Sequence, residues 1–338
     1  MKKFSGIDLH SNNSVVVVSD EVDHIVYQLR LPNDALQIRA ALAPHREELE
    51  GVVIEATYNW YWLVDALFAD GYHVHLANPA AIRQYEGLKF SGDFTDAAHL
   101  AQLLRLGLLP EGYIYPADGR QVRDLARKRM QLVQCRTTQI LAIGNLFARH
   151  TGSQMHGPQV KRLDGAQVSR FGFAPDVTLA IRANLAVLQT LQQQIEIVEK
   201  RLMQQVKLNP DYALLNTVPG IGPMLATTIM LETGTISRFA TVGHFSSYCR
   251  CVDSRRESNS RKKGEGNTKN GNRYLAWAFV EAANFAIRTC PQARRFYERK
   301  KRMRNGIVAI KALAHKLARA CYHMLREHKP FETVRCFG

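Results

Sequence analysis

The sequence has no long apolar run and no organised set of cysteines. No apolar stretch approaches the ~20 residues that a membrane-spanning helix needs. Asp8 interrupts the N-terminal segment, so no signal-peptide core is present, and we expect a cytoplasmic protein with no membrane partner. The six cysteines form no CxxC pair. Cys249 and Cys251, with His244 nearby, lack the second ligand pair that a zinc site requires.

Acidic residues are scarce in the last quarter of the chain. Residues 1–249 contain 23 Lys and Arg against 23 Asp and Glu, whereas residues 250–338 contain 22 against 7. The whole formal net charge of +15 therefore lies in the C-terminal segment. A domain-sized segment this basic is typical of nucleic-acid binding. A merely solvated basic face would need no such segregation, so we expect DNA or RNA as a partner.

The N-terminal 115 residues alternate between strand and helix patterns. Strands are expected at 4–8, 14–19, 24–30, 51–55 and 73–77. Helices are expected near 34–47, 59–70, 79–86 and 94–107. Three successive strands followed by alternation of strands and helices predict a mixed sheet of RNase H-like type, with helices on both faces. The fold class is therefore α/β in this part of the chain.

The rest of the sequence is mainly helical. Long helices are expected at 119–150 and 177–207, and the second repeats apolar residues as a heptad. Such a coiled-coil segment would either mediate dimerisation or pack within one chain. Helices near 272–289 and 306–328, separated by a basic run at 294–304, close the sequence. We expect three domains: 1–117, a coiled-coil segment 118–207, and a basic domain 208–338.

Four acids stand at places where a metal site can form. Asp8 and Glu55 each end an apolar strand, and Asp93 and Asp96 open an amphipathic helix. Residues three apart share a helix face, and strand ends of an open sheet hold ligands. Converging carboxylates repel unless a divalent ion lies between them. The alternative for the helical pair is ordinary stabilisation of a helix N-terminus.

Two glycine-containing segments in the basic domain predict phosphate contacts. Pro-Gly-Ile-Gly, with Gly220 and Gly222, lies between two helices as in a helix-hairpin-helix unit, whose backbone N–H groups bind phosphate. Packing alone is an equal alternative for this turn. Residues 254–273 form a polar segment that we expect to be a flexible loop. Its Lys and Arg residues are the expected nucleic-acid contacts: Arg255, Arg256, Arg261, Lys262, Lys263, Lys269 and Arg273.

The same polar segment contains two candidate nucleophiles, Ser258 and Ser260. Cations on both sides of a hydroxyl can stabilise the charge that develops on an attacked phosphate. A solvated loop without catalytic function is the alternative for such a composition.

With these pieces in view, the sequence resembles the DEDD transposases of insertion sequences, the family numbered one hundred and ten with its eleven-eleven subgroup. The pilin-gene inverting recombinase belongs to the same family. The resemblance extends in order over nearly the whole chain. The matching motifs are GID at 6–8, IEAT at 54–57, NPA at 78–80, DxxDA at 93–97, PGIG at 219–222 and RRESxS at 255–260.

This resemblance implies a fold, a cofactor and a nucleophile. It implies a RuvC-like domain in which Asp8, Glu55, Asp93 and Asp96 bind Mg²⁺ or Mn²⁺. It also implies a transposase domain whose serine, here Ser258, becomes linked to DNA. Members of the family are similar to recombinases guided by a structured non-coding RNA, so DNA and a guide RNA are the implied partners, in a homodimer or homotetramer.

Two positions depart from the family pattern. Asn259 stands after the serine where glycine is frequent, which keeps Ser260 as a rival nucleophile. Ser-Gly-Asp precedes the helix where Lys-Thr-Asp is usual, which makes Asp93 the least secure ligand.

Other functional classes are compatible with part of this evidence. A Holliday-junction resolvase or nuclease would use the same acids with water as the nucleophile. An actin-like or sugar-kinase ATPase shares Gly-Ile-Asp-Leu, but His10 and its neighbours replace the expected glycine and threonine. A basic architectural or RNA-binding protein would not depend on the carboxylates at all.

Overall fold

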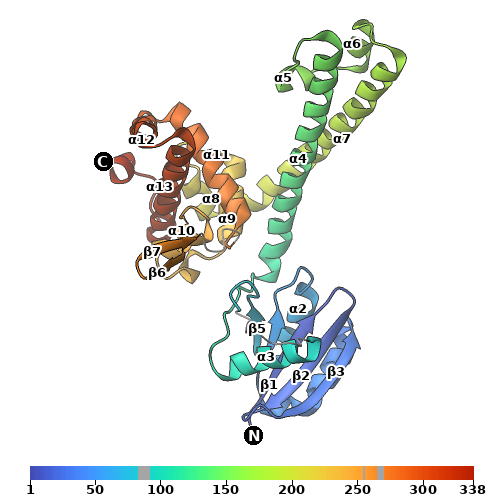
Figure 1. Cartoon of the computed structure of the whole chain (residues 1–338), viewed down its shortest axis with the longest axis vertical. Coiled ribbons are helices and arrows are strands. Elements are labelled where there is room, and N and C mark those ends of the chain that lie inside the picture. Colours follow the sequence, from blue (N-terminus) through green and yellow to red (C-terminus); the bar gives the residue numbers. More distant parts are fainter. Residues whose placement is uncertain (83–91, 254–255, 265–269) are drawn as a thin grey trace. The chain divides into compact units, whose positions relative to one another are not determined.

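The structure is a computed structural model that describes residues 1–82, 92–253, 256–264 and 270–338 (Figure 1). Two compact units divide the chain, Met1–Ala117 and Asp118–Gly338. The predicted class, a mixed α/β region followed by a helical region, is confirmed. Among the described residues, no helix is long and apolar enough to cross a membrane.

A five-stranded mixed sheet forms the centre of the N-terminal unit. Its strands are β1 (Lys3–Leu9), β2 (Asn13–Asp20), β3 (Ile25–Pro32), β4 (Leu49–Glu55) and β5 (Val74–Ala77). Their order is β3-β2-β1-β4-β5, with β1 antiparallel to β2, β2 antiparallel to β3, and β1, β4 and β5 mutually parallel. All five strands lie close to their predicted positions.

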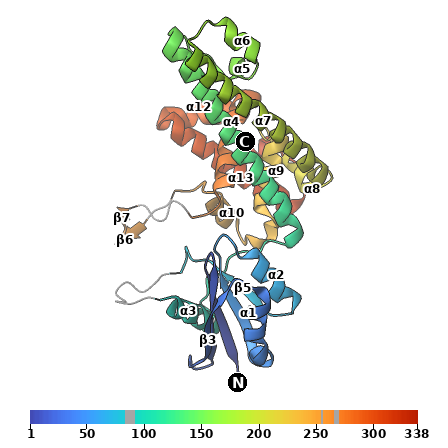
Figure 2. The same ribbon diagram turned by 90° about the vertical axis from the view of Figure 1, so that its right-hand side faces the viewer.

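Helices cover both faces of this sheet (Figure 2). On one face lie α1 (Ala35–Leu42), the short 3-10 helix η1 (Ala43–Glu48) and α2 (Tyr61–Ala69); on the other lies α3 (Asp93–Arg105). Successive side chains of a strand point to opposite faces. Ile7 and Ile54 are therefore buried in one core cluster, whereas Val15 packs with Ala97 of α3 in another.

The helix predicted near 79–86 does not begin at the predicted residue. Residues 79–81 form a turn, and residues 83–86 of the expected helix lie outside the described residues. Asn78 accepts the backbone N–H groups of Ala81 and Ile82, which closes this turn.

Two long helices begin the C-terminal unit, α4 (Ala117–Thr151) and α7 (Pro175–Val206). Short helices α5 (Gly157–Val160) and α6 (Gly165–Arg170) lie in the connection between them (Figure 1). Ion pairing of Arg129 with Glu199 and a hydrogen bond from Arg136 to Gln192 join the two helices. The heptad residues Leu188, Ile195 and Leu202 are buried within this single chain, which favours intrachain packing as their function. Dimerisation stays a prediction.

A second core unites the remaining helices. They are α8 (Pro210–Leu215), α9 (Pro223–Thr233), the 3-10 helix η2 (Ile236–Arg238), α10 (Val242–Tyr248), α11 (Arg273–Thr289), α12 (Pro291–Met303), α13 (Gly306–Glu327) and α14 (Thr333–Phe337). The largest fully buried side chains of this core are Phe245 and Phe279. The predicted helices at 272–289 and 306–328 are confirmed as α11 and α13.

Two expectations for the basic domain are wrong. The run 294–304 is not a separator, because most of it belongs to α12: Lys and Arg are good helix formers, and Ala293 and Phe296, three residues apart, both pack against the core. The polar segment 254–273 contains an antiparallel hairpin of β6 (Arg256–Ser258) and β7 (Arg261–Gly264) and is not one continuous loop.

Candidate metal centre and serine hairpin

The acids at the two strand ends lie on the α3 face of the sheet. Asp8 follows Gly6 by two residues in β1, and Gly6 faces the backbone of α3 at Ala97. Glu55 follows Val53 by two residues in β4, and Val53 packs with residues of α3. Because side chains alternate along a strand, Asp8 and Glu55 share this face. Their strands are direct neighbours, with Ile7 opposite Ile54.

Helix α3 brings the other two acids to the same place. Asp93 is its first residue, and Asp96 lies in its first turn. Gly92 precedes the helix with an extended backbone and accepts the backbone N–H of Asp96. The charges of Asp93 and Asp96 both act on Asp8 and oppose its ionisation. The structure therefore places the four predicted acids close enough to interact.

Burial and mutual repulsion perturb the two strand acids. Asp8 is only 5% exposed, and burial raises the pKa of its carboxyl, with Asp93 and Asp96 adding to the effect. Burial, followed by the hydrogen bond and the charge of Asp8, raises the pKa of Glu55 to about 7. Ionisation of carboxyl groups that are buried side by side is unfavourable, because the two negative charges repel each other. A bound cation would relieve this repulsion.

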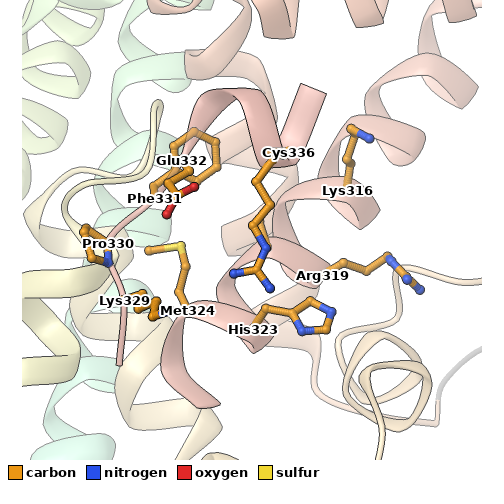
Figure 3. A pocket seen from close by; sticks show the side chains of 11 residues that line it. Lys316, Arg319, His323, Met324, Lys329, Pro330, Phe331, Glu332 and Cys336 are labelled. Atoms are coloured by element: carbon orange, nitrogen blue, oxygen red, sulfur yellow. The ribbon is translucent and has the colours of Figure 1, made fainter. Parts of the chain in front are cut away.

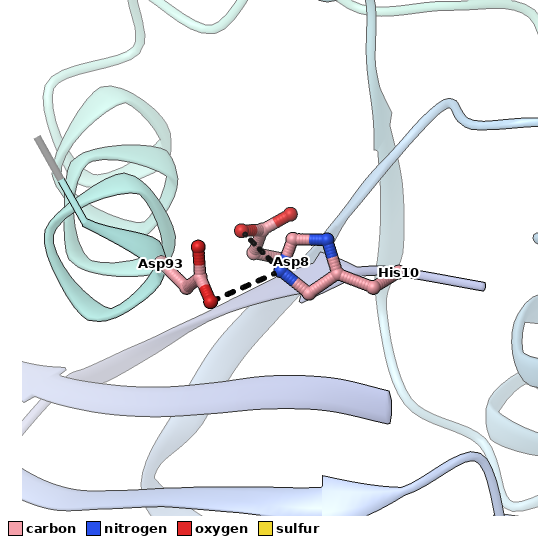
Figure 4. A group of neighbouring side chains, drawn as sticks. All are labelled: Asp8, His10 and Asp93. Atoms are coloured by element: carbon pink, nitrogen blue, oxygen red, sulfur yellow. Dashed lines mark ion pairs between the residues drawn. The ribbon is translucent and has the colours of Figure 1, made fainter. Parts of the chain in front are cut away.

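His10, which the sequence interpretation did not assign to the site, lies between two of the acids (Figure 4). Its Nε2 atom is 3.3 Å from Oδ2 of Asp8 and 3.4 Å from Oδ2 of Asp93. This nitrogen is buried and faces both carboxylates. One ligand atom from each of the three side chains lies within 4.8 Å of the others. A signal was present: His10 follows Asp8 by two residues, the spacing of one strand face.

Arg30 of β3 is a second residue that the sequence interpretation missed. It forms an ion pair with Asp93, and this contact holds the pKa of the Asp93 carboxyl below its usual value. Sheet register explains its position, because Asp8 pairs with Val15 and Val15 pairs with Arg30. Strand pairing brings these residues together, and pairing was not evident in the sequence.

In the C-terminal unit, the serine candidates lie at the tip of the β6–β7 hairpin. Ser258 pairs with Arg261, and the two residues between them have positive φ angles, 52° at Asn259 and 59° at Ser260. Two left-handed residues in a two-residue loop are typical of a type I′ turn. Ser258 and Ser260 are both exposed. Ser258 thus belongs to a strand end beside Arg261, whereas Ser260 belongs to the turn itself.

Two family models match the chain. One, described as "Transposase" and named for the DEDD enzymes of IS110, covers residues 5–150. The other, described as "Transposase IS116/IS110/IS902 family", covers residues 212–298. The chain belongs to this transposase family. It is therefore an enzyme that cuts and rejoins DNA, and its DEDD domain implies the use of a divalent metal.

Two curated relatives agree with this assignment. A protein of Pseudomonas aeruginosa named "Probable family 20 transposase" is 24% identical over 336 residues, which are 95% of this chain and 96% of the relative. A Streptomyces coelicolor protein named "Insertion element IS110 uncharacterized 43.6 kDa protein" is 24% identical over 147 residues. That match covers 43% of this chain and 36% of the Streptomyces protein.

Not every predicted nucleic-acid contact of this transposase can be placed. Arg255 and Lys269 lie outside the described residues, and for Arg256 and Lys262 only the backbone positions in β6 and β7 are described. Lys263 is exposed on β7. Arg273 begins α11 and lines a pocket of about 600 Å³ with Arg127, Trp277 and other residues of α4 and α11.

The two glycines of the Pro-Gly-Ile-Gly turn have different surroundings. At Gly220, φ is 88° and a Cβ atom would lie 2.2 Å from the carbonyl oxygen of Ala282 in α11. This glycine therefore permits close packing of the turn against α11, the alternative to phosphate binding. Gly222 precedes α9, is exposed and has open space around it. Phosphate contact at either glycine stays a prediction.

Proposed function

We propose that this transposase recombines DNA at a composite site that combines the DEDD carboxylates with Ser258. The observation that carries the proposal is the convergence of Asp8, Glu55, Asp93 and Asp96 on the α3 face of one sheet. The strand order β3-β2-β1-β4-β5 and the mixed strand directions support an RNase H-like domain. Nucleases of that type use clustered acids for phosphoryl transfer.

The carboxylates fit a divalent cation. Oxygen ligands are preferred by Mg²⁺ and Mn²⁺, and the buried Nε2 of His10, which faces Asp8 and Asp93, is a candidate nitrogen ligand beside them. Asp8, Glu55 and Asp96 would hold the ion, with Asp93 shared between this role and its ion pair with Arg30. When bound, the ion would stabilise negative charge on the scissile phosphate.

Ser258 supplies the nucleophile in this proposal. Its Oγ bonds to the phosphorus of the DNA backbone, the bond from phosphorus to the 3′-oxygen breaks, and the released 3′-oxygen takes up a proton. The hydroxyl proton of Ser258 passes to a carboxylate of the DEDD cluster. Attack by a different 3′-hydroxyl on the phosphoserine reverses these bond changes and rejoins the strands without ATP, because the ester conserves the phosphodiester energy.

The carboxylates and the serine belong to different compact units. We therefore assign the complete site to the DNA-bound assembly, in which the acids meet the serine of the same or of a second chain. An element-encoded structured RNA would pair with donor and target DNA. A guided enzyme needs few base-reading side chains, and the surplus of positive charge in residues 250–338 suits both RNA and DNA backbones.

A trapped covalent adduct tests the proposal. The protein is incubated with DNA that contains the ends of its own element, the structured flanking RNA, and Mg²⁺ or Mn²⁺; denaturing gels then report protein–DNA adducts. We expect adducts with the wild type and none with Asp8→Asn, which removes one charge at constant volume. Metal-dependent strand cleavage without any adduct would instead support a resolvase that uses water.

A further inference from the structure

A basic pocket of about 330 Å³ lies between α13 and the C-terminal segment 329–336 (Figure 3). This volume is within the ~300–1,000 Å³ typical of small-ligand sites. No residue of the pocket belongs to the DEDD cluster or to the serine hairpin. Its function is therefore separate from the strand-transfer chemistry proposed above.

Positive charge dominates the lining. Lys316, Arg319 and His323 follow one another at spacings of three and four residues, so they share one face of α13. Lys329 and Arg335 approach from the C-terminal segment, and Glu332 is the one carboxylate among the lining residues. Cations gathered in a concave surface repel one another unless an anion joins them.

Some of the cations that line the pocket already have a partner within the described part of the chain, and others do not. Arg335 forms two hydrogen bonds, of 2.6 and 2.7 Å, with the carboxylate of Glu327. The ammonium of Lys316 lies 5.3 Å from the ring centre of Phe296, a cation–π contact. Arg319 and Lys329 are exposed, and neither forms an ion pair with a described residue. These two side chains are available to an anionic ligand.

The pocket also has an apolar wall. Met324 is 6% exposed, and Phe331 is half-buried beside it. The backbone N–H of Phe331 donates to Oγ1 of Thr217 at 2.9 Å, and that of Lys329 donates to the carbonyl of Met324. The segment is thus fixed before any ligand arrives. An aromatic face beside a phosphate-binding group is the combination with which proteins bind single-stranded nucleic acids.

We propose that this pocket binds one unpaired nucleotide of a nucleic-acid strand, with its phosphate between Arg319 and Lys329 and its base against Phe331. The inference rests on the proposed function, because it deepens the nucleic-acid binding assigned to the basic segment. Its location supports a strand over a free nucleotide: α12 packs against α13 and α14 and contains six Lys and Arg among 13 residues. The shared chemistry, a phosphate and an unstacked base, is present in single-stranded DNA and in unpaired RNA.

Binding of labelled single strands to the full-length protein tests this inference. The probes are oligodeoxythymidine, oligouridine of the same length, and an abasic deoxyribose strand, each titrated over a series of salt concentrations. The double variant Arg319→Ala/Lys329→Ala should reduce the log–log salt slope by about 0.7, which corresponds to the one phosphate of a single strand that these two side chains hold. Phe331→Leu should weaken binding of strands with bases by about fivefold or more, but not that of the abasic strand.

Two matched variants serve as controls. Arg326→Ala removes an exposed cation of α13 outside the lining, and Phe337→Leu changes a neighbouring ring outside the lining. Both should bind the single strands as the wild type does. Tighter binding of oligouridine than of oligodeoxythymidine, abolished by the pocket variants, would assign the pocket to RNA; the reverse order would assign it to DNA.

The failure of this inference differs from the failure of the proposed function. If pocket and control variants bind single strands equally well while duplex DNA is still bound, the pocket assignment is wrong and the function stands. If Phe331→Leu weakens abasic and base-containing strands alike, the pocket is an anion site and not a nucleotide site. If the wild type binds neither single strands nor duplex DNA, the proposed function itself fails.

Discussion

Gly6 of β1 lies against Ala97 of α3 so closely that a Cβ atom on Gly6 would be 1.9 Å from the carbonyl oxygen of Ala97. Any side chain at this position would have to push the helix backbone away from the sheet. The first turn of α3 contains Asp93 and Asp96, and Asp8 follows Gly6 in the strand. The absence of a side chain at Gly6 is therefore a condition for the four acids to meet.

Gly6→Ala should consequently damage both stability and metal binding. Because the clash is with backbone atoms, we expect a loss of about 1–3 kcal/mol in the free energy of unfolding, as for other overpacked sites. Metal affinity, measured by Mn²⁺ titration, should fall as α3 moves. Gly92→Ala is the matched control, since its surroundings are open and its φ of −150° suits alanine. Equal metal affinity in the two variants would contradict this account.

The sequence predicted the α3-face acids better than it predicted their neighbours. Short apolar runs indicated where the strands lie, and the strand ends together with the DxxD spacing located Asp8, Glu55, Asp93 and Asp96. His10 and Arg30 were missed for different reasons. His10 lies one residue beyond β1 and was considered only as a departure from the phosphate loop of an ATPase. Arg30 reaches Asp93 only through the pairing of β1, β2 and β3, and one sequence cannot specify the strand register.

Local polarity misled the interpretation of the basic domain. Residues 254–273 contain glycine, asparagine and many charges, a composition that favours loops, yet Asn259 and Ser260 form the type I′ turn of a hairpin. Asn favours positive φ, so this part was open to prediction. The basic run 294–304 hid α12, because the apolar side chains of this helix that pack against the core are few, Ala293, Phe296 and Tyr297, and charged residues occupy most of the remaining positions.

Removal of one carboxylate should stabilise the metal-free protein at alkaline pH. Glu55 has a pKa of about 7 in the folded chain against 4.5 ordinarily, so between these values the native state binds more protons than the unfolded state. The free energy of unfolding therefore falls as the pH rises through this interval. Glu55→Gln should flatten that fall, raising Tm at pH 8 more than at pH 4.5, as measured in EDTA.

The same variant tests the metal site. Mg²⁺ or Mn²⁺ at pH 8 should raise the Tm of the wild type, because an ion that binds only the folded state stabilises it, and should raise that of Glu55→Gln much less. Glu50→Gln in the same strand is the control and should respond to the metal as the wild type does. A Glu55→Gln protein with an unchanged pH profile and full metal response would contradict the assignment.

Glu232 holds three parts of the C-terminal unit together through one buried carboxylate. It is 3% exposed and accepts two hydrogen bonds from Arg127 of α4, at 2.6 and 2.8 Å, and one from Asn272 at 2.7 Å. Arg127→Met would leave this charge buried without its partner, which costs about 3–5 kcal/mol. Urea denaturation should show that loss, and the double variant Arg127→Met/Glu232→Gln should recover part of it.

We expect the Lys and Arg residues of α12 to contribute to the salt dependence of duplex DNA binding. Deletion of residues 250–338 would not test this contribution. The deletion would remove α11 and α13, which share one core with α9, and so would disrupt the fold. We instead expect Arg295→Gln/Lys301→Gln/Arg302→Gln to flatten the log–log salt slope on duplex DNA by up to about 2.7, at about 0.9 per phosphate. The control changes three exposed cations of α7: Arg182, Lys200 and Arg201. An unchanged slope in the α12 variant would move the binding surface to the arginines of 120–136.

The hairpin geometry separates the two candidate nucleophiles. Ser260 has a φ of 59° within a type I′ turn, a conformation in which glycine is favoured. Ser260→Gly should therefore preserve the hairpin and, if Ser258 is the nucleophile, the yield of protein–DNA adduct. Ser258 lies beside Arg261 at the strand end, and Ser258→Ala should abolish the adduct. Peptide mass spectrometry of the digested wild-type adduct identifies the linked serine directly. An adduct at Ser260, or undiminished adduct in Ser258→Ala, would make the assignment wrong and leave the enzyme class intact.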